Sequence, residues 1–339
     1  MQPSLKYIAE ECGVSKMAVS KALRGHSSIS KQLRIKIKAV AERIGYQPNI
    51  SAISLRSGKT HNIGILWSLG GPHDSAGLIR DVSLKLMDNS YVSYIADSLS
   101  DPKIINSCLK DYVARNIDGL IIQLSSDATF ECILRDDVKS YLKQIGNVVI
   151  VNETGRALPQ ELKYDEIQRQ LQPATEEIID YLTMRGRTKI AFLCGSLNSW
   201  REERLIECLK ERGLAYENCR LINYPGNQVI ILDSLLKKIY DDSALHYDAI
   251  LTHCDESAVQ VINYLLKHGI KIPDDIAVVG FNDSLFSPYF APPIASVERR
   301  SPELATIAVD LLMKRIKNKN TPLQQVELPM RFVKRESAG

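Results

Sequence analysis

From residue 61 onward, short apolar runs alternate with longer segments of helical spacing, and this alternation restricts the fold more than any other feature of the sequence. The apolar runs are NIGILW, YVSYIA, DGLIIQL, NVVIVN, KIAFLC, DAILTH and IAVVGF, and helical patterns such as 76–88 and 104–116 lie between them. Nearly continuous apolar strands separated by helices are typical of parallel sheets covered on both faces. The sequence therefore predicts an α/β fold, doubly wound and long enough for two lobes.

The first 45 residues follow a different pattern, that of three short helices. A first helical pattern has Leu5, Ile8, Ala9 and Cys12 on one face, and Gly13 permits a tight turn before Ser15, which is placed to cap a second helix. In the stretch VSKMAVSKAL one helical face carries Lys16, Met17, Ser20 and Lys21, and the other carries Ala18, Val19, Ala22 and Leu23. A third amphipathic pattern runs from Ser30 to Gly45. Two helices joined by a tight turn, with a supporting third, predict a helix-turn-helix.

The basic residues are concentrated in this amino-terminal part. Residues 1–60 hold eleven Lys or Arg and three Asp or Glu, a net charge of +8, whereas the whole chain carries only +3. The alternative interpretation of the same residues is a small helical bundle with a solvated basic face. A basic module beside a mildly acidic remainder favours contact with phosphates instead, because neutralised phosphates release condensed counterions. Nucleic acid is therefore the predicted partner.

Composition excludes several other classes of protein. No apolar run approaches the roughly 18 residues of a membrane span, and the amino-terminus lacks the apolar stretch of a signal peptide, so we expect a cytoplasmic protein without membrane contact. The seven cysteines form no CxxC pair, which favours reduced thiols over a disulfide framework or a zinc site. We expect no metal and no cofactor.

The segment 48–60 is predicted to connect the two parts as a short hinge helix and linker. Pro48 stops the third helix, Asn49 can cap a new one, and two turns of helix are marginal in water unless something packs against them. Leu55 followed by Arg56 suits an apolar wedge in the minor groove with a phosphate contact behind it. A plain linker, with the leucine packed on the next domain, is the alternative. The predicted domains are thus 1–47, 48–60 and 61–339.

Ligands of doubly wound sheets bind outside the carboxyl ends of the strands, which directs attention to the loops 68–75, 125–127, 195–201, 253–256 and 282–288. These loops contain no GxGxxG, GxxxxGK[ST], nucleophile elbow or HExxH, so no enzymatic activity is expected. They offer single polar groups beside aromatic rings, which fits a small polar ligand such as a sugar or a nucleobase. The candidate ligand-binding residues are His73, Asp74, Ser125, Trp200, Arg201, Cys254, Asp255 and Asn282.

Over essentially its whole length the chain resembles the LacI/GalR family of bacterial transcription regulators. The segments that carry the resemblance are LKYIAEECGVSKMAVSKALRG, IGYQPNISAISLRSGKTHNIGIL, RNIDGLII, MRGRTKIAFLCG, DAILTHCDESA, IKIPDDIAVVGFND and PPIASV. The resemblance implies a lambda-repressor-like helix-turn-helix domain joined to a two-lobed domain like a periplasmic sugar-binding protein. The family's function would make the chain a repressor controlled allosterically by a small molecule such as a sugar.

The resemblance also implies roles for individual residues. Lys16, Met17 and Lys21 would read bases, Ser15, Ser20 and Arg24 would lie near phosphates, and Leu55 would be the hinge-helix wedge. Arg201 falls on the family's ligand arginine. The sequence departs from the family at Asn282, usually aspartate, at Cys254, often asparagine, and in DEIQRQLQPA, where an aspartate-asparagine-glycine pattern is usual.

From these features we expect a homodimer that places two recognition helices in successive major grooves of a pseudo-palindromic operator. Ligand-driven movement of the lobes would change the spacing of the hinge segments. Three other classes of protein compete with this interpretation. A solute-binding receptor would need export, and an α/β enzyme would need a nucleophile, metal or cofactor site. The remaining alternative is a ligand-independent DNA-binding regulator whose effector pocket has degenerated.

Overall fold

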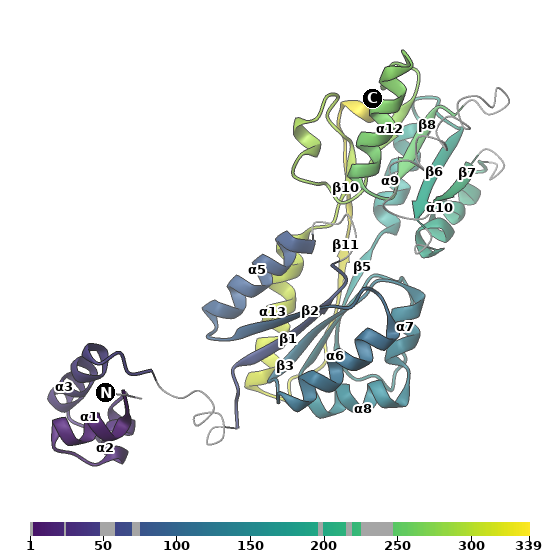
Figure 1. The fold of residues 1–339 in the computed structure, drawn as a ribbon. Helices are drawn as coiled ribbons and strands as arrows, with labels where there is room; N and C mark the ends of the chain where they lie inside the picture. The colour runs from purple at the N-terminus through teal and green to yellow at the C-terminus, as the bar shows by residue number, and fades with distance from the viewer. Residues whose placement is uncertain are drawn as a thin grey trace. The chain divides into compact units, whose positions relative to one another are not determined.

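The structure is a computed structural model of the 339-residue chain, and it describes residues 3–23, 25–47, 58–69, 75–195, 199–214, 219–224 and 247–339. The chain divides into two compact units, Met1–Thr60 and His61–Gly339. Figure 1 shows the helices and strands of both. Each unit is described by itself.

The amino-terminal unit contains the three expected helices, α1 (Leu5–Cys12), α2 (Lys16–Leu23) and α3 (Lys31–Arg43). Gly13 ends α1 in the left-handed region, with φ 70°, and its N–H closes the helix on Ala9 and Glu10 carbonyls. Ser30 caps α3 by accepting a hydrogen bond from the Leu33 N–H at 3.3 Å. The apolar faces of the helices meet in one small core, with Ile8, Val19, Ala22 and Ile37 fully buried. The predicted helix-turn-helix with a supporting helix is confirmed.

The first lobe of the large unit is built on a six-stranded sheet in which every pair of neighbours is parallel. Its order is β11 (Gln325–Pro329), β5 (Asp165–Gln170), β4 (Val148–Asn152), β3 (Gly119–Leu124), β1 (Asn62–Trp67) and β2 (Val92–Asp97). Helices α5 (Ser75–Asp88) and α13 (Ser301–Lys317) cover one face. Helices α6 (Pro102–Ala114), α7 (Asp127–Ile133) and α8 (Asp136–Ile145) cover the other (Figure 1).

The second lobe has a four-stranded parallel sheet of order β7 (Cys219–Tyr224), β6 (Ile190–Gly195), β8 (Ala249–Thr252) and β9 (Ala277–Val279). Helices α9 (Gln172–Thr183) and α10 (Ser199–Glu211) pack on one face, and α12 (Asp255–Lys267) packs on the other. The strands β10 (Ser296–Glu298) and β12 (Arg331–Val333) form a separate antiparallel pair beside this sheet. The predicted doubly wound α/β fold with two lobes is confirmed.

Within the described residues the chain passes between the two lobes at three places. The first is 170–172, between β5 and α9, the second is 299–301, between β10 and α13, and the third is 329–331, between β11 and β12. The first and third connections are joined by a backbone hydrogen bond from the Met330 N–H to the Gln170 carbonyl at 2.8 Å. Each lobe therefore contains segments from distant parts of the sequence.

No helix in the part of the chain that the structure describes is long and apolar enough to cross a membrane.

Candidate DNA-reading helix and effector cleft

The amino-terminal unit presents the outer face of α2 to solvent. Ser15 caps this helix by accepting a hydrogen bond from the Ala18 N–H at 3.2 Å. Val19 and Ala22 anchor the helix in the core, and both are fully buried. Lys16 is exposed and Met17 is 68 % exposed, although a methionine side chain is stabilised by burial. The helix therefore holds a large apolar side chain in water next to a cation.

The two lysines of this face remain available to a partner. Among the described residues, neither Lys16 nor Lys21 has a carboxylate within ion-pair distance, whereas Lys6 pairs with Glu10 at 3.8 Å and Arg43 pairs with Glu11. Arg34 is used internally, since it donates to the Gly25 carbonyl at 3.1 Å and so ties α3 to the segment that follows α2. The face can offer charge to phosphates and hydrogen bonds to base edges.

The other DNA-facing residues of the prediction fall into two groups. Ser20 is half-buried on α2, and its helical spacing places it on the same face as Lys16 and Met17. Arg24, Leu55 and Arg56 lie outside the described residues. The wedge prediction for Leu55 therefore stays a prediction from the sequence.

The large unit contains a polar cleft of about 270 Å³ where the first connection passes between the lobes. Its lining residues come from the end of β4, the loop that follows it, the second half of β5, and helices α9 and α10; they are Asn152, Gly155, Arg156, Gln168, Arg169, Gln170, Leu171, Gln172, Pro173, Glu176 and Arg204. Four of the eleven residues carry amide side chains, which both donate and accept hydrogen bonds. Such a lining suits a ligand with many hydroxyl groups.

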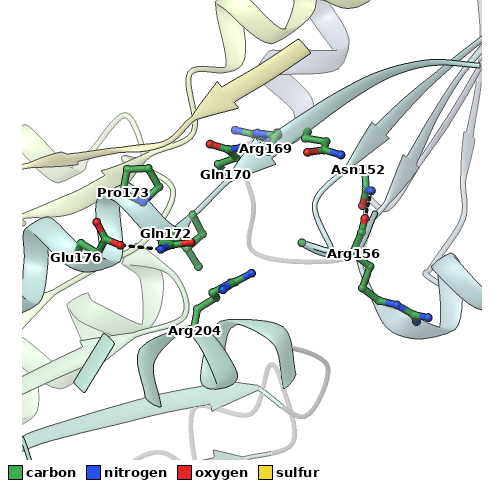
Figure 2. Close-up of a pocket in the computed structure, with 11 residues that line it drawn as sticks. Asn152, Arg156, Arg169, Gln170, Gln172, Pro173, Glu176 and Arg204 are labelled. Carbon is green, nitrogen blue, oxygen red and sulfur yellow. Dashed lines mark hydrogen bonds between the residues drawn. The ribbon is translucent and has the colours of Figure 1, made fainter. Parts of the chain in front are cut away.

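Figure 2 shows how the charged side chains of this cleft are directed. Arg204 extends from α10 toward the cleft, and its only described ion-pair partner is Glu207, at 2.6 Å on the exposed side of the helix. Arg156 points away and pairs with Glu131 at 2.7 Å, with its guanidinium over the Phe130 ring. Glu176 accepts a hydrogen bond from Gln172 at 2.8 Å. Arg204 is thus the cation best placed to meet a ligand.

The carboxyl edge of the first sheet carries a chain of three serine hydroxyls. Ser100 lies 3.2 Å from Ser68 and 3.0 Å from Ser125, measured between hydroxyl oxygens. The Ser68 N–H donates to the Gln123 side chain at 3.0 Å, which connects this hydroxyl chain to the interior of the lobe. Ser125, a predicted ligand residue, therefore belongs to a polar wall, and sequence reasoning missed its two serine neighbours.

Three predicted ligand residues lie in the interior of the second lobe. Cys254 is almost fully buried, and burial raises the pKa of its thiol to about 12, so the thiol stays neutral. Asp255 is fully buried and accepts hydrogen bonds from the Ser284 N–H at 2.5 Å and the Ser296 hydroxyl at 2.6 Å. Burial raises the pKa of this carboxyl as well. Asn282 is also buried, with a left-handed backbone of φ 104°.

The remaining predicted ligand residues cannot be placed at the cleft. His73 and Asp74 lie outside the described residues, and Trp200 and Arg201 stand in the first turn of α10, where the structure describes the helix but not their side chains. Sequence reasoning missed Gln168, Gln170 and Arg204. The signal for the glutamines is their alternation along DEIQRQ, and the signal for Arg204 is its place three residues after Arg201 on a helix.

Each lobe also exposes a group of large apolar side chains. On the first lobe they lie on α5 and on the edge strand β2 with the turn after it: Leu84, Met87, Val92, Tyr94, Ile95 and Leu99. On the second lobe they lie in or beside the 3₁₀ turn Ser287–Tyr289: Leu285, Phe286 and Tyr289. Concentrated exposed apolar surface marks sites of protein association.

Comparison with known proteins finds a match for part of each unit. Residues 4–49 match bacterial regulatory proteins of the lacI family, and residues 179–338 match the periplasmic binding protein-like domain. The ribose operon repressor of Escherichia coli strain K12 is 24 % identical over 343 residues, which cover 99 % of each chain.

Two solved structures show the same fold. A lac repressor dimer bound to operator and the anti-inducer ONPF matches with a TM-score of 0.84 and 19 % identity over 99 % of each chain. A LacI family transcriptional regulator from Enterococcus faecium with bound ribose matches with a TM-score of 0.67 and 20 % identity, over 82 % of this chain and 98 % of that one.

Proposed function

This chain belongs to the lacI family of bacterial regulatory proteins, and on that premise we propose that it represses transcription as a homodimer whose DNA affinity is set by a sugar-like effector. The effector occupies the cleft beside β5. The protein acts in the cytoplasm and catalyses no reaction.

The observation that carries the proposal is the outer face of α2. Lys16, Met17 and Lys21 stand on one helix that is fixed by its cap at Ser15 and by the buried Val19. The lysines suit guanine edges or phosphates, and the methionine suits thymine methyl groups or pyrimidine rings. Exposure of this apolar side chain is explained when it contacts a base.

Three further residues on the DNA side come from the sequence and the family resemblance. We assign Arg24 to a DNA phosphate, Leu55 to the minor groove at the operator centre, and Arg56 to the DNA backbone next to that groove. Ser15 and Ser20 contribute hydroxyls near the phosphates. Two such half-sites, related by the twofold axis of a dimer, require a pseudo-palindromic operator.

The lining of the cleft supports a polyhydroxylated effector. The side chains of Asn152, Gln168, Gln170 and Gln172 offer amides to it, and Arg204 offers a fork of donors. Ser125 and its hydroxyl neighbours extend the polar wall on the first lobe. As the sequence predicts, we assign His73 and Asp74, in the loop after β1, to the first lobe's side of the site, and Trp200, Arg201 and the buried Cys254, Asp255 and Asn282 to the second lobe's side. The ribose bound in the similar Enterococcus faecium regulator supports the same class of ligand.

The exposed apolar groups support self-association through both lobes. An isologous dimer buries the same patch of each protomer, so α5 with β2 on the first lobe and Phe286 with Tyr289 on the second would each meet their own copies. Because each lobe contributes a contact, a change in the angle between the lobes alters the dimer and with it the spacing of the two α2 helices.

Selection of bound DNA from random fragments with the purified full-length protein tests the DNA half of the proposal. We expect enrichment of pseudo-palindromic sites with affinities that fall steeply with salt concentration. Absence of sequence enrichment at low salt would contradict it.

Calorimetry of the same protein with ribose, cellobiose and a nucleobase tests the effector half, followed by operator binding with each compound that gives heat. We expect a sugar to bind and to change operator affinity. Operator binding that no compound alters would favour the ligand-independent regulator instead.

A further inference from the structure

One carboxylate in the first lobe holds two of the three connections between the lobes. Glu153 directly follows β4 and is 3 % exposed. Arg169, at the end of β5, donates to it at 2.8 Å, and Arg299, in the second connection, donates to both of its oxygens at 2.7 Å. Arg169 also donates to the Arg299 carbonyl. The three side chains therefore form one closed cluster at the base of the hinge.

The burial of this cluster is unusual for its charge. The side chains of Arg169 and Arg299 are 0 % and 8 % exposed, and two cations share one described carboxylate partner. Burial, followed by the neighbouring Arg299, lowers the pKa of Arg169 to about 10, which leaves it charged at neutral pH. Charges are rarely buried unless they are paired, because their desolvation is costly. An apolar cluster would stabilise a static core at least as well, so the charges point to a role in geometry.

The cluster reaches the cleft directly, because Arg169 lines it, and it is also linked to the serine chain at the carboxyl edge of the first sheet. Gln123 donates to Glu153 at 3.1 Å and accepts from the Ser68 N–H at 3.0 Å. Ser68 begins the loop after β1 and carries the first hydroxyl of the serine chain. On the other side, Arg300 adopts a left-handed backbone with φ 50° immediately before α13, so the second connection turns sharply just after the contact with Glu153. A ligand that contacts the serine chain would therefore act on the hinge through two hydrogen bonds.

We infer that Glu153 is the positioning residue of the lobe hinge, a clasp that holds the first and second connections together and transmits occupancy of the cleft to the angle between the lobes. The claim that Glu153 transmits occupancy of the cleft, the regulatory half, rests on the proposed function. The claim that Glu153 holds the connections together, the mechanical half, concerns only the large unit. Because the third connection is bonded to the first through Met330 and Gln170, the clasp constrains all three.

Hydrogen exchange of the full-length protein, measured by mass spectrometry without DNA or ligand, tests the clasp. The informative variant is Arg299→Gln, which removes the side-chain contact between the second connection and Glu153, leaves Arg169 and Glu153 as a balanced pair, and keeps the bond from Arg169 to the carbonyl of residue 299. We expect amides in 169–172, 299–303 and 329–331 to exchange at least about tenfold faster than in the wild type, as loss of charge-assisted hydrogen bonds implies. Glu153→Gln should show the same local effect together with a lower melting temperature.

Asp165→Asn is the matched control. Asp165 and Arg315 form another buried ion pair in the same lobe, at 2.9 Å, at the end of β5 that is remote from the connections. Exchange in this variant should increase near Gln324, whose N–H donates to Asp165 at 2.9 Å. The inference is overturned if Arg299→Gln accelerates the three connections no more than Asp165→Asn does, or accelerates both lobes evenly.

The two halves of the statement can fail separately. The exchange pattern requires no operator, so a protein that binds no DNA could still show the clasp. Conversely, operator binding by Arg299→Gln that responds to a sugar as the wild type does would remove the regulatory half alone.

Discussion

The outer face of α2, which we propose reads DNA, and the cleft proposed for the effector are built in opposite ways. The reading face comes from one stretch of eight residues on α2, and its side chains project from a helix whose inner residues Val19 and Ala22 are fully buried. The cleft draws its lining from β4, β5, α9 and α10, and the segments that bear it are held by buried charges such as Arg169 with Glu153. A site made by one helix can be changed residue by residue, whereas a site made at a hinge depends on everything that positions the hinge.

The largest expected effect tests whether the two units are independent. Ile37→Ala removes a fully buried side chain from the small core of the amino-terminal unit and should cost about 2–5 kcal/mol of its unfolding free energy. A core of this size supplies only a few kcal/mol in total, so the unit should unfold and DNA binding should be lost. Calorimetric melting should show an unchanged transition for residues 61–339. A lowered transition there would mean that the units stabilise one another.

Lys21→Ala tests whether the outer face of α2 contacts bases. Loss of a base contact should weaken operator binding by about 1–3 kcal/mol and relax base preference at one position in each half-site. The control is Lys6→Ala, which removes a lysine already paired with Glu10 on α1. Binding selections with the two variants provide the measurement. An unchanged sequence preference in Lys21→Ala would mean that this lysine contacts phosphate only.

Arg204→Ala addresses the cleft side. Removal of a guanidinium that donates to a bound sugar should weaken effector binding by about tenfold or more, as for other charged hydrogen bonds, and leave operator binding without effector unchanged. Arg212→Ala is the matched control, because Arg212 follows the same helix but pairs with Asp180 away from the cleft. Calorimetric titration with the sugar that binds the wild type would measure the difference. Equal losses in the two variants would contradict the assignment of Arg204.

The smallest expected effect concerns Glu166, which lies beneath the cleft and accepts a hydrogen bond from Asn152 at 2.7 Å. Burial raises the pKa of Glu166, so the folded state binds its proton more tightly than the unfolded state does. The stability that the protonated Glu166 contributes is fully present below the pKa that this carboxyl has in the unfolded chain. It is lost as the pH rises through the raised pKa of the folded chain. Urea unfolding of Glu166→Gln and the wild type at acid and at neutral pH measures this effect. The stability of the variant relative to the wild type should increase as the pH is raised from acid to neutral.

The sequence was most informative where apolar residues carry the pattern. All seven apolar runs became strands, and α5 begins one residue before and ends at the predicted boundary. The strand β5 was missed because DEIQRQ contains one apolar residue among six, although four of its residues are buried. The short strands β10 and β12 were missed because they pair with each other across more than thirty residues. Their pairing depends on the whole second lobe.

The reading face was predictable for the same reason, since helical spacing alone separates Lys16 and Met17 from Val19. The cleft was not. Glu153, Arg169 and Arg299 would each be assigned to the surface from residue type, and only the meeting of three distant segments buries them. The predicted ligand residues Cys254 and Asp255 follow a strand as expected, but their side chains turn into the second lobe.

The chain passes between the lobes three times, and this affects the order in which the protein can fold during its synthesis. The strand β11 completes the edge of the first sheet and β12 pairs within the second lobe, and both lie within 325–333, far along the chain from the other strands of the first sheet. During translation the amino-terminal helices can fold as soon as they leave the ribosome, but both lobes must wait until residues 325–333 have been synthesised. A truncated product would thus carry a competent DNA-binding unit on an unfinished sensor, and rapid proteolysis of such fragments would protect the operator from an unregulated competitor.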